Sequence, residues 1–326
     1  MKRPLLAIIS LGLCALCGCL SFHQGALPQE PAAATFMQAR GARIRVVDTK
    51  TEGPVVVLVH GFAASSDTWA AVRPVLSKKF RVVALDLKGF GWSDRPAGDY
   101  SPEEQARTLL SVLDELKIKE FSIVGHSWGS SVVLALSLMA PERVRRIALY
   151  DAWIYEEQLP TFFLWARQAA LGEFLFWLFY KEQPGLKIAD AFYDQRFVTE
   201  ALVEDVDQTL DRPGTVAAAL AAVRGQRYEY VQQRYAQIDK PVLLMWGRED
   251  KVTPLWVGER LAAQLPQAEL ISYPRCGHFP MIEAFAASTR ALDRFMSKEL
   301  SASATANAAA QQEPSISPLE PGEVVP

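Results

Sequence analysis

The chain has 326 residues, half of them apolar, and a formal net charge of −3 from 34 basic and 37 acidic side chains. This length is enough for one large hydrophobic core or two modest ones. The basic residues neither form a run nor alternate with aromatic ones, so we expect no nucleic-acid partner.

The N-terminus has the pattern of a secretory signal. Lys2 and Arg3 precede residues 4–20, which hold no charged side chain, and a short basic region before an apolar stretch is typical of such signals. Near its end the stretch reads Leu16-Cys17-Gly18-Cys19. These four residues resemble the lipobox of bacterial lipoproteins, in which the signal is cut before a cysteine that then carries diacylglycerol.

This resemblance implies a signal peptide at 1–19, a lipid on Cys19 and a place in the bacterial cell envelope, with the membrane as a partner. Leu20, rather than an aspartate, follows the cysteine and favours the outer membrane over the inner one. An ordinary signal peptide and an uncleaved anchor remain as alternatives. The seventeen uncharged residues lie at the lower limit of a membrane span, which needs about 17–25.

Three of the four cysteines lie in this leader, and Cys276 is the only one outside it. A disulfide within the folded domain is therefore impossible. Cys276 stands two residues before His278, and we interpret it as a packing residue because nothing around it marks a second nucleophile.

The segments at 20–34 and 301–326 differ in composition from the rest of the chain. The first holds Pro28, Pro31 and a run of alanines, and we interpret it as a tether. The second is rich in Ala, Ser, Pro and Gln and has almost no large apolar residue. Such a segment cannot bury enough surface to offset the entropy cost of ordering, so it is predicted to be disordered.

Eight short segments are predicted to be strands. Residues 35–40 and 43–48 form a hairpin, and 55–59 is a β-branched run of the kind that is buried on both faces of a sheet. Further strands are expected at 81–86, 121–124, 144–150, 242–246 and 269–273. Helices are expected at 67–77, 102–116, 127–140, 254–265 and 284–300. This alternation predicts an α/β fold, with a mostly parallel eight-stranded sheet and helices on both faces.

Residues 153–236 break the alternation, because they contain no clear strand and many aromatic side chains. We interpret them as a helical cap inserted between two parts of the core, 35–152 and 237–300. Arg167 and Glu173 interrupt the most apolar stretch, which argues against a membrane span. Most of the aromatics are expected to pack the cap on the core. An apolar substrate pocket and contact with a lipid surface are the alternatives.

A candidate nucleophile lies between the strand at 121–124 and the following helix, in Gly125-His126-Ser127-Trp128-Gly129. A Gly-x-Ser-x-Gly pattern between strand and helix requires a very sharp turn, and the small residues around Ser127 let the two backbones approach each other. The serine hydroxyl then projects above the sheet. An ordinary serine in a loop between strand and helix is the alternative.

A serine hydroxyl needs a base to take its proton, and the base needs an orienting partner. The chain has four histidines. His23 lies in the tether, His60 follows a strand, and His126 is expected to face away from the serine. His278, in a loop after the last strand, is therefore the predicted base, with a surface loop histidine as the alternative.

Asp250 is the predicted acid, because it follows the strand at 242–246 at the edge where sites on parallel sheets gather. Glu249 is its closest rival. The chain order Ser127, Asp250, His278 is the order of an α/β-hydrolase triad. From about residue 35 to 300, cap excluded, the chain resembles the α/β-hydrolase fold family.

In that family a His-Gly pair begins the oxyanion-hole loop, and here the pair is His60-Gly61, followed by Phe62. The resemblance implies that the backbone N–H groups of Phe62 and Trp128 form the oxyanion hole and that His60 braces the loop. Losing one such donor typically costs about 2.7–4 kcal/mol.

The elbow also resembles the His-Asp-Trp-Gly of haloalkane dehalogenases and epoxide hydrolases, but this chain has Ser127 where those families have an aspartate. A serine attacking an alkyl carbon would form an ether with no hydrolysis route, so serine indicates acyl chemistry. We therefore expect a serine hydrolase that cleaves carboxylic esters of apolar substrates through an acyl-enzyme, with no metal or organic cofactor.

Two other enzyme classes remain open, an aminopeptidase like the prolyl iminopeptidases and a hydrolase of carbon–carbon bonds. An aminopeptidase needs cap carboxylates for the substrate amine, and Glu156, Glu157 and Glu173 are the candidates. The alternative from another class is a non-catalytic lipoprotein that binds a ligand through its cap; the intact set of triad residues argues against it.

Overall fold

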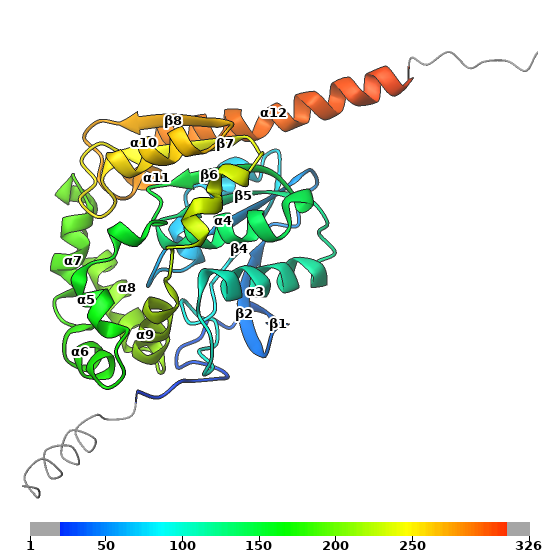
Figure 1. The fold of residues 1–326 in the computed structure, drawn as a ribbon. Coiled ribbons are helices and arrows are strands. Elements are labelled where there is room, and N and C mark those ends of the chain that lie inside the picture. Colours follow the sequence, from blue (N-terminus) through cyan, green and yellow to red (C-terminus); the bar gives the residue numbers. More distant parts are fainter. Residues whose placement is uncertain (1–19, 312–326) are drawn as a thin grey trace, which may run out of the picture.

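The computed structural model describes residues 20–311. The expected signal peptide at 1–19, including Cys19, lies outside the described residues, as do residues 312–326. The centre of the molecule is an eight-stranded sheet in the order β1-β2-β4-β3-β5-β6-β7-β8 (Figure 1). Its strands are β1 Thr35–Ala39, β2 Ala42–Asp48, β3 Val55–Val59, β4 Arg81–Leu85, β5 Phe121–His126, β6 Val144–Tyr150, β7 Val242–Gly247 and β8 Ala268–Tyr273.

The sheet is mostly parallel, which confirms the predicted fold class. Only β1 with β2 and β2 with β4 pair antiparallel, and the six strands β4, β3, β5, β6, β7 and β8 run parallel to one another. All six residues of β5 and of β7 are buried, because helices cover both faces of the sheet at its centre. The carboxyl ends of β5, β6 and β7 therefore meet at one edge, where Ser127, Asp151 and Asp250 follow them.

Helices lie on both faces of this sheet. One hydrophobic cluster joins it to α3 Pro102–Glu115, α4 Trp128–Met139 and α10 Leu255–Gln264. A second cluster joins its other face to α2 Arg73–Leu76, α11 Pro280–Glu283 and α12 Phe285–Gln311. A 3₁₀ turn, η2 Pro141–Arg143, links α4 to β6.

The single helix predicted at 67–77 is wrong. The structure has a 3₁₀ turn, η1 Ser66–Trp69, followed by the short α2. Pro74 has no N–H to donate to the preceding turn, so it fits in the first turn of a new helix but not in the interior of a continuous one.

The disordered tail predicted at 301–326 does not begin at residue 301, because α12 continues to Gln311. Residues 303–310 are mostly alanine, the strongest helix former. The predicted disorder of this segment rested only on its lack of apolar surface to bury. Extending an existing helix adds one hydrogen bond per residue and needs no such burial.

The insertion between β6 and β7 is helical, and it contains no strand in the structure. Its elements are η3 Glu156–Gln158, α5 Thr161–Ala166, α6 Leu171–Phe179, α7 Pro184–Ala191, η4 Gln195–Phe197, α8 Glu200–Asp211, α9 Thr215–Gly225 and η5 Val231–Gln237. A cluster around Ala166, Phe176 and Leu220 holds α5, α6 and α9 together. None of the helices among residues 20–311 has the length and apolar character needed to cross a membrane.

The segment at 20–34 is not a free tether, because it lies on the folded core. The backbones of His23 and Arg95 exchange two hydrogen bonds of 2.8 Å, and Leu27 is buried. Glu30 forms an ion pair of 2.5 Å with Arg43 on β2. Proline and alanine content gave no sign of this docking, because backbone pairing and an ion pair depend little on composition.

Candidate active site

Ser127 occupies the turn between β5 and α4 with φ 50° and ψ −126°. A positive φ is strained for a residue with a side chain, so the surroundings must hold it in place. The Ser127 N–H donates to the Tyr150 carbonyl at 2.9 Å, and the Ser127 carbonyl accepts from the Trp153 N–H at 3.1 Å. The serine thus stands on a sharp, fully braced turn at the carboxyl edge of the sheet.

Two glycines bring the loop after β3 against this turn. A Cβ on Gly129 would lie 2.2 Å from the His60 carbonyl oxygen, and one on Gly61 would lie 3.1 Å from the Ser127 Cβ. Within residues 20–311, the backbone N–H groups of Phe62 and Trp128 donate to no turn, loop or side-chain acceptor. They are therefore free to receive an oxygen beside Ser127, as the expected oxyanion hole requires.

Asp250 and His278 lie together, buried at the end of β7. Asp250 Oδ2 is 2.7 Å from His278 Nδ1, and the Thr253 hydroxyl donates to the same oxygen at 2.5 Å. Asp250 Oδ1 accepts from the N–H groups of Val252 and Thr253 at 2.7 and 3.0 Å. The carboxylate is thus fixed by the turn that follows it, and it fixes one ring nitrogen of His278.

Burial alone would raise the pKa of Asp250. The charge of His278 and the hydrogen bonds from His278 and Thr253 outweigh that effect, so the pKa of Asp250 lies below its usual range. Asp250 is therefore ionised at neutral pH and able to stabilise an imidazolium on His278.

Glu249, the rival acid, has a different role in the structure. Its Oε2 accepts from the Cys276 N–H at 3.0 Å and so braces the loop that carries His278. Cys276 itself is buried, and burial raises the pKa of its thiol well above the usual range. A thiol that stays protonated is a poor nucleophile, which agrees with the packing role expected for it.

His60 and His126 are both buried, and burial lowers the pKa of each, to about 3 for His126. His60 Nε2 accepts from the Leu87 N–H at 2.9 Å, and its Nδ1 lies 2.7 Å from the Gly61 carbonyl, so it braces the loop. His126, which was expected to face away from the serine, contacts His278. Its Nε2 lies 2.8 Å from the His278 carbonyl, and its ring packs on the ring of His278.

Asp151 is the residue that sequence reasoning missed. It follows β6 directly and is fully buried, with φ 43°. Its Oδ1 accepts from the Gly247 N–H at 2.9 Å, whereas its Oδ2 has no partner among the described residues. Burial and the neighbouring charge of Asp250 raise the pKa of Asp151 well above its usual range. Its position in the sequence could have identified it, because Asp151 directly follows a strand, as Ser127 and Asp250 follow theirs, at the carboxyl edge of the sheet.

One possible metal-ligand atom from each of Asp151, Asp250 and His278 lies within 4.8 Å of the other two. Among residues 20–311, this is the group of side chains spaced closely enough to hold one metal ion. Asp250 and His278 already bond directly at 2.7 Å, and N–H and O–H donors fill the other sites of the Asp250 carboxylate. The arrangement therefore fits a hydrogen-bonded acid–base pair better than a metal centre.

The cap contacts the histidine loop directly. The His278 N–H donates to the carbonyl of Ala191, at the end of α7, at 2.7 Å. Glu283 joins the same two parts, because its Oε1 accepts from Gly277 at 2.8 Å and its Oε2 accepts from Tyr193 and Asp194 at 2.9 Å. These hydrogen bonds therefore link the position of the cap to the position of His278.

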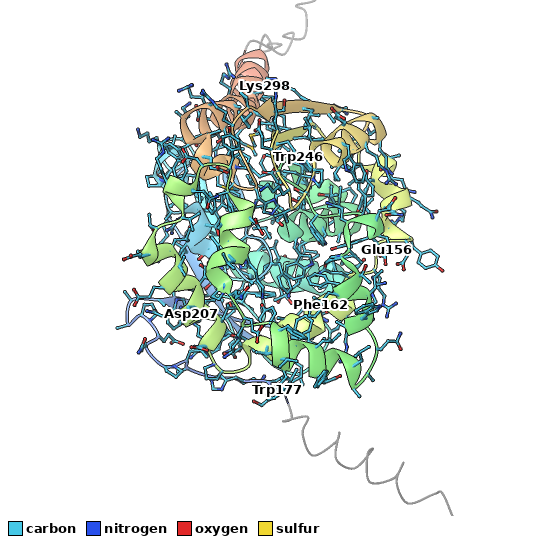
Figure 2. All side chains as sticks on the ribbon, turned by 90° about the vertical axis from the view of Figure 1, so that its left-hand side faces the viewer. Glu156, Phe162, Trp177, Asp207, Trp246 and Lys298 are labelled. Atoms are coloured by element: carbon cyan, nitrogen blue, oxygen red, sulfur yellow. The ribbon has the colours of Figure 1, made fainter. Side chains whose placement is uncertain are left out.

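Aromatic side chains surround the expected oxyanion loop. The Phe62 ring lies 5.9 Å from that of Phe163 on α5 and 6.4 Å from that of Tyr180, which follows α6. Trp128 lies 6.0 Å away on the core side. Ser127, which precedes Trp128, is only 8 % exposed. Phe162 on the same helix α5, labelled in Figure 2, is partly buried and packs on the cap cluster.

The chain is similar in sequence to known hydrolases. The sequence is 31% identical over 259 residues to the 2-hydroxy-6-oxo-2,4-heptadienoate hydrolase of Pseudomonas putida, covering 76% of this chain and 90% of that protein. It is 31% identical to the 2-hydroxy-6-oxononadienedioate/2-hydroxy-6-oxononatrienedioate hydrolase of Cupriavidus pinatubonensis, covering 78% and 90%.

Among solved structures, the chain is similar to the meta-cleavage product hydrolase of Pseudomonas fluorescens IP01. The TM-score is 0.69 at 26% identity, and the match covers 81% of this chain and 98% of that one. The sequence model of the alpha/beta hydrolase fold matches residues 54–285. This match covers well over half of the chain and includes the elbow, the acid and the histidine. The chain is therefore an enzyme of the α/β-hydrolase fold family.

Proposed function

We propose that this hydrolase uses Ser127, His278 and Asp250 to break the carbon–carbon bond beside a ketone, in a substrate of the 2-hydroxy-6-oxo-dienoate class. The observation that carries the proposal is the 31% identity, over three quarters of the chain, to hydrolases named for such compounds. A 6-oxo-dienoate contains neither ester nor amide. Its hydrolysis must therefore cleave a carbon–carbon bond. This was an alternative to the ester hydrolase that the sequence favoured.

The proposed chemistry begins with Ser127 Oγ adding to the ketone carbon while His278 takes the serine proton. The carbonyl oxygen becomes an oxyanion, which the N–H groups of Phe62 and Trp128 stabilise. The substrate reacts as its 2-oxo tautomer, in which the proton of the 2-hydroxyl group has moved to C5. The bond between C5 and the ketone carbon then breaks, its electron pair passes through the C3–C4 double bond onto the 2-oxo group, and the resulting dienolate takes the proton from His278. The acyl group stays on Ser127 until water, deprotonated by His278, releases it as a carboxylic acid.

A direct assay compares two substrate classes on the same purified enzyme. We expect 2-hydroxy-6-oxo-2,4-heptadienoate to be turned over with a kcat/KM at least tenfold above that of any member of a p-nitrophenyl ester chain-length series. Loss of the dienoate chromophore and release of acetate are measured. Ser127→Ala must abolish both activities. Ester turnover with no dienoate cleavage would overturn the proposal.

Ester hydrolysis is the second candidate, and a specific observation favours it. A dienoate substrate carries a carboxylate, yet two cap arginines, Arg167 and Arg224, are already paired with glutamates. Arg167 bonds Glu156 and Arg224 bonds Glu173, each at 2.7 Å. A neutral apolar ester needs no such cation.

The aminopeptidase alternative loses its main support. It needs free cap carboxylates, but each of the three candidates is bound to an arginine. Glu156 bonds Arg167, Glu157 bonds Arg260 at 2.6 Å, and Glu173 bonds Arg224. An aminoacyl-anilide panel, run beside the esters, checks this directly; we expect no turnover.

We also propose that the enzyme is anchored in the bacterial cell envelope by a lipid on Cys19. The sequence pattern of residues 2–19 supports this proposal. Metabolic labelling with a fatty acid should mark the wild type and not Cys19→Ala. Labelling retained in Cys19→Ala would exclude this cysteine as the lipid site.

A further inference from the structure

Six large apolar side chains on two neighbouring cap helices are exposed. They form what we call the aromatic face, and each is between 39% and 57% exposed: Leu164, Trp165, Leu171, Phe174, Trp177 and Phe179. Trp177 projects from the edge of the molecule opposite Lys298 in Figure 2. Single exposed apolar residues are ordinary, but six of them on two helices that pack together indicate an interaction surface.

The aromatic face carries no exposed charge. Between residues 161 and 180 the only charged side chains are Arg167 and Glu173, and neither is fully exposed. Arg167 is paired with Glu156, and Glu173 with Arg224. The charged groups of this segment therefore point inward to partners, while its apolar groups point outward.

Helix α6 is apolar on both sides. Gly172 and Phe176 are buried against the rest of the cap, whereas Leu171, Phe174 and Trp177 follow one another at three-residue spacing on the outer side. A surface helix in water normally has a polar outer side. The outer side of α6 thus suits an apolar environment.

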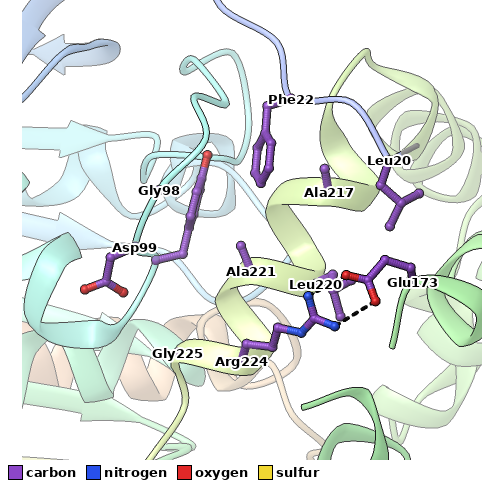
Figure 3. A pocket seen from close by; sticks show the side chains of 11 residues that line it. Leu20, Phe22, Gly98, Asp99, Glu173, Ala217, Leu220, Ala221, Arg224 and Gly225 are labelled. Carbon is purple, nitrogen blue, oxygen red and sulfur yellow. Dashed lines mark hydrogen bonds and ion pairs between the residues drawn. The ribbon is translucent and has the colours of Figure 1, made fainter. Parts of the chain in front are cut away.

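The apolar N-terminal stretch joins the domain beside this helix. Leu20, the first described residue, packs on the cap cluster that contains Phe176. Leu20 and Glu173 of α6 also line one cavity of about 620 Å³, with α9 as its floor (Figure 3). Cys19, the proposed lipid site, immediately precedes Leu20, so the anchor proposed above would join the domain next to the cap cluster of α6.

We propose that the aromatic face docks on a lipid bilayer, with Trp165 and Trp177 at the boundary between the headgroups and the acyl chains. Three observations select a bilayer as the occupant: the packing of Leu20, which follows the proposed lipid site Cys19, on the cap cluster, the pairing of both charged side chains of 161–180, and two exposed tryptophans. The first of these rests on the anchor proposed above. Tryptophan prefers the membrane interface because its ring is amphipathic. Docking would bring α5, whose Phe163 touches the expected oxyanion loop, next to the lipid.

Three of the eight tryptophans are largely exposed, which provides an internal control. Trp165 and Trp177 lie on the aromatic face, and Trp256 lies on α10, which packs on β7 and β8 away from α6 (Figure 1). The full-length protein is reconstituted in phosphatidylcholine vesicles with or without brominated acyl chains, and tryptophan fluorescence is measured. Bromine quenches only tryptophans that touch the acyl region.

We expect brominated lipid to lower the emission of the wild type and of Trp256→Phe by the same absolute amount. The Trp165→Phe/Trp177→Phe variant should lose most of that decrease, since phenylalanine keeps the face apolar but removes the reporting rings. No decrease in the wild type would overturn the proposal, as would happen if the face paired with a second copy of the chain. A decrease that survives in the double variant, or disappears in Trp256→Phe, would also overturn it.

Discussion

Two buried aspartates lie at the same edge of the sheet, and their surroundings decide which is charged. Asp250 receives N–H, hydroxyl and imidazole donors, whereas Asp151 receives one N–H from Gly247. Burial raises the pKa of both groups, but the charge of His278 and these donors outweigh it at Asp250, so the pKa of Asp250 lies below its usual range. At Asp151, burial and the charge of Asp250 act together and raise the pKa well above its usual range. The different charges and donors around the two aspartates thus favour different protonation states.

Replacing these two aspartates should separate their roles. Asp250→Asn keeps the shape of the side chain but removes the charge that stabilises the imidazolium, so kcat should fall by roughly 10³–10⁴-fold. Asp151→Asn keeps the acceptor for Gly247 and should lower kcat by less than tenfold. Steady-state kinetics on one substrate measure both. Equal losses in the two variants would contradict the assignment.

Asp151→Asn should also change stability in a pH-dependent way. Because the folded-state pKa of Asp151 is raised, the stability that its protonated form supplies is complete below the unfolded pKa, about 3.9, and is lost as pH rises toward the folded pKa. The asparagine of the variant does not ionise, so it loses no stability as the pH rises. We therefore expect a higher Tm for the variant at pH 8 and no advantage at pH 4. An advantage of the same size at both pH values would exclude this explanation.

The sequence was most informative for secondary-structure elements whose pattern is local. The β-branched run of β3 and the Gly-x-Ser-x-Gly turn predict a strand and an elbow without long-range knowledge, and both are present. Elements that depend on distant partners were predicted poorly. The docking of 20–34 depends on pairing with Arg95, and the role of Asp151 depends on Gly247, which is 96 residues away in the sequence.

The elbow depends on a glycine at 129. An alanine Cβ there would lie 2.2 Å from the His60 carbonyl oxygen, which is backbone and cannot move aside cheaply. We expect Gly129→Ala to destabilise the fold by about 1–3 kcal/mol. Gly185→Ala on α7 is the matched control: its Cβ meets Val203 at an ordinary 3.4 Å, and the change should be neutral or stabilising. Urea unfolding compares them, and equal midpoints would refute the argument.

For the whole molecule, the sequence predicted a capped α/β-hydrolase but not how the cap is joined to the chemistry. Composition identified the insertion through its aromatics. The link itself consists of backbone groups, namely Ala191 to His278 and the N–H groups that Glu283 collects from both sides. Backbone hydrogen bonds between distant segments leave no pattern in the sequence.

Glu283→Gln should weaken this connection, or joint, between the cap and the loop that carries His278. The amide offers one oxygen in place of two, and its NH₂ would face an N–H donor. We expect a lower kcat, because His278 is held less firmly, and faster proteolytic cleavage within 181–199. Glu182→Gln, an exposed cap residue, is the control and should change neither. Unchanged activity and cleavage in Glu283→Gln would show that the joint does not control His278.

The most direct test of the account is covalent trapping of the nucleophile. A fluorophosphonate reacts only with a serine activated by a working base. We expect one adduct per chain, on the peptide that contains Ser127, which is absent in Ser127→Ala and forms much more slowly in Asp250→Asn. No adduct on the wild type, or equal labelling of Ser127→Ala, would contradict it.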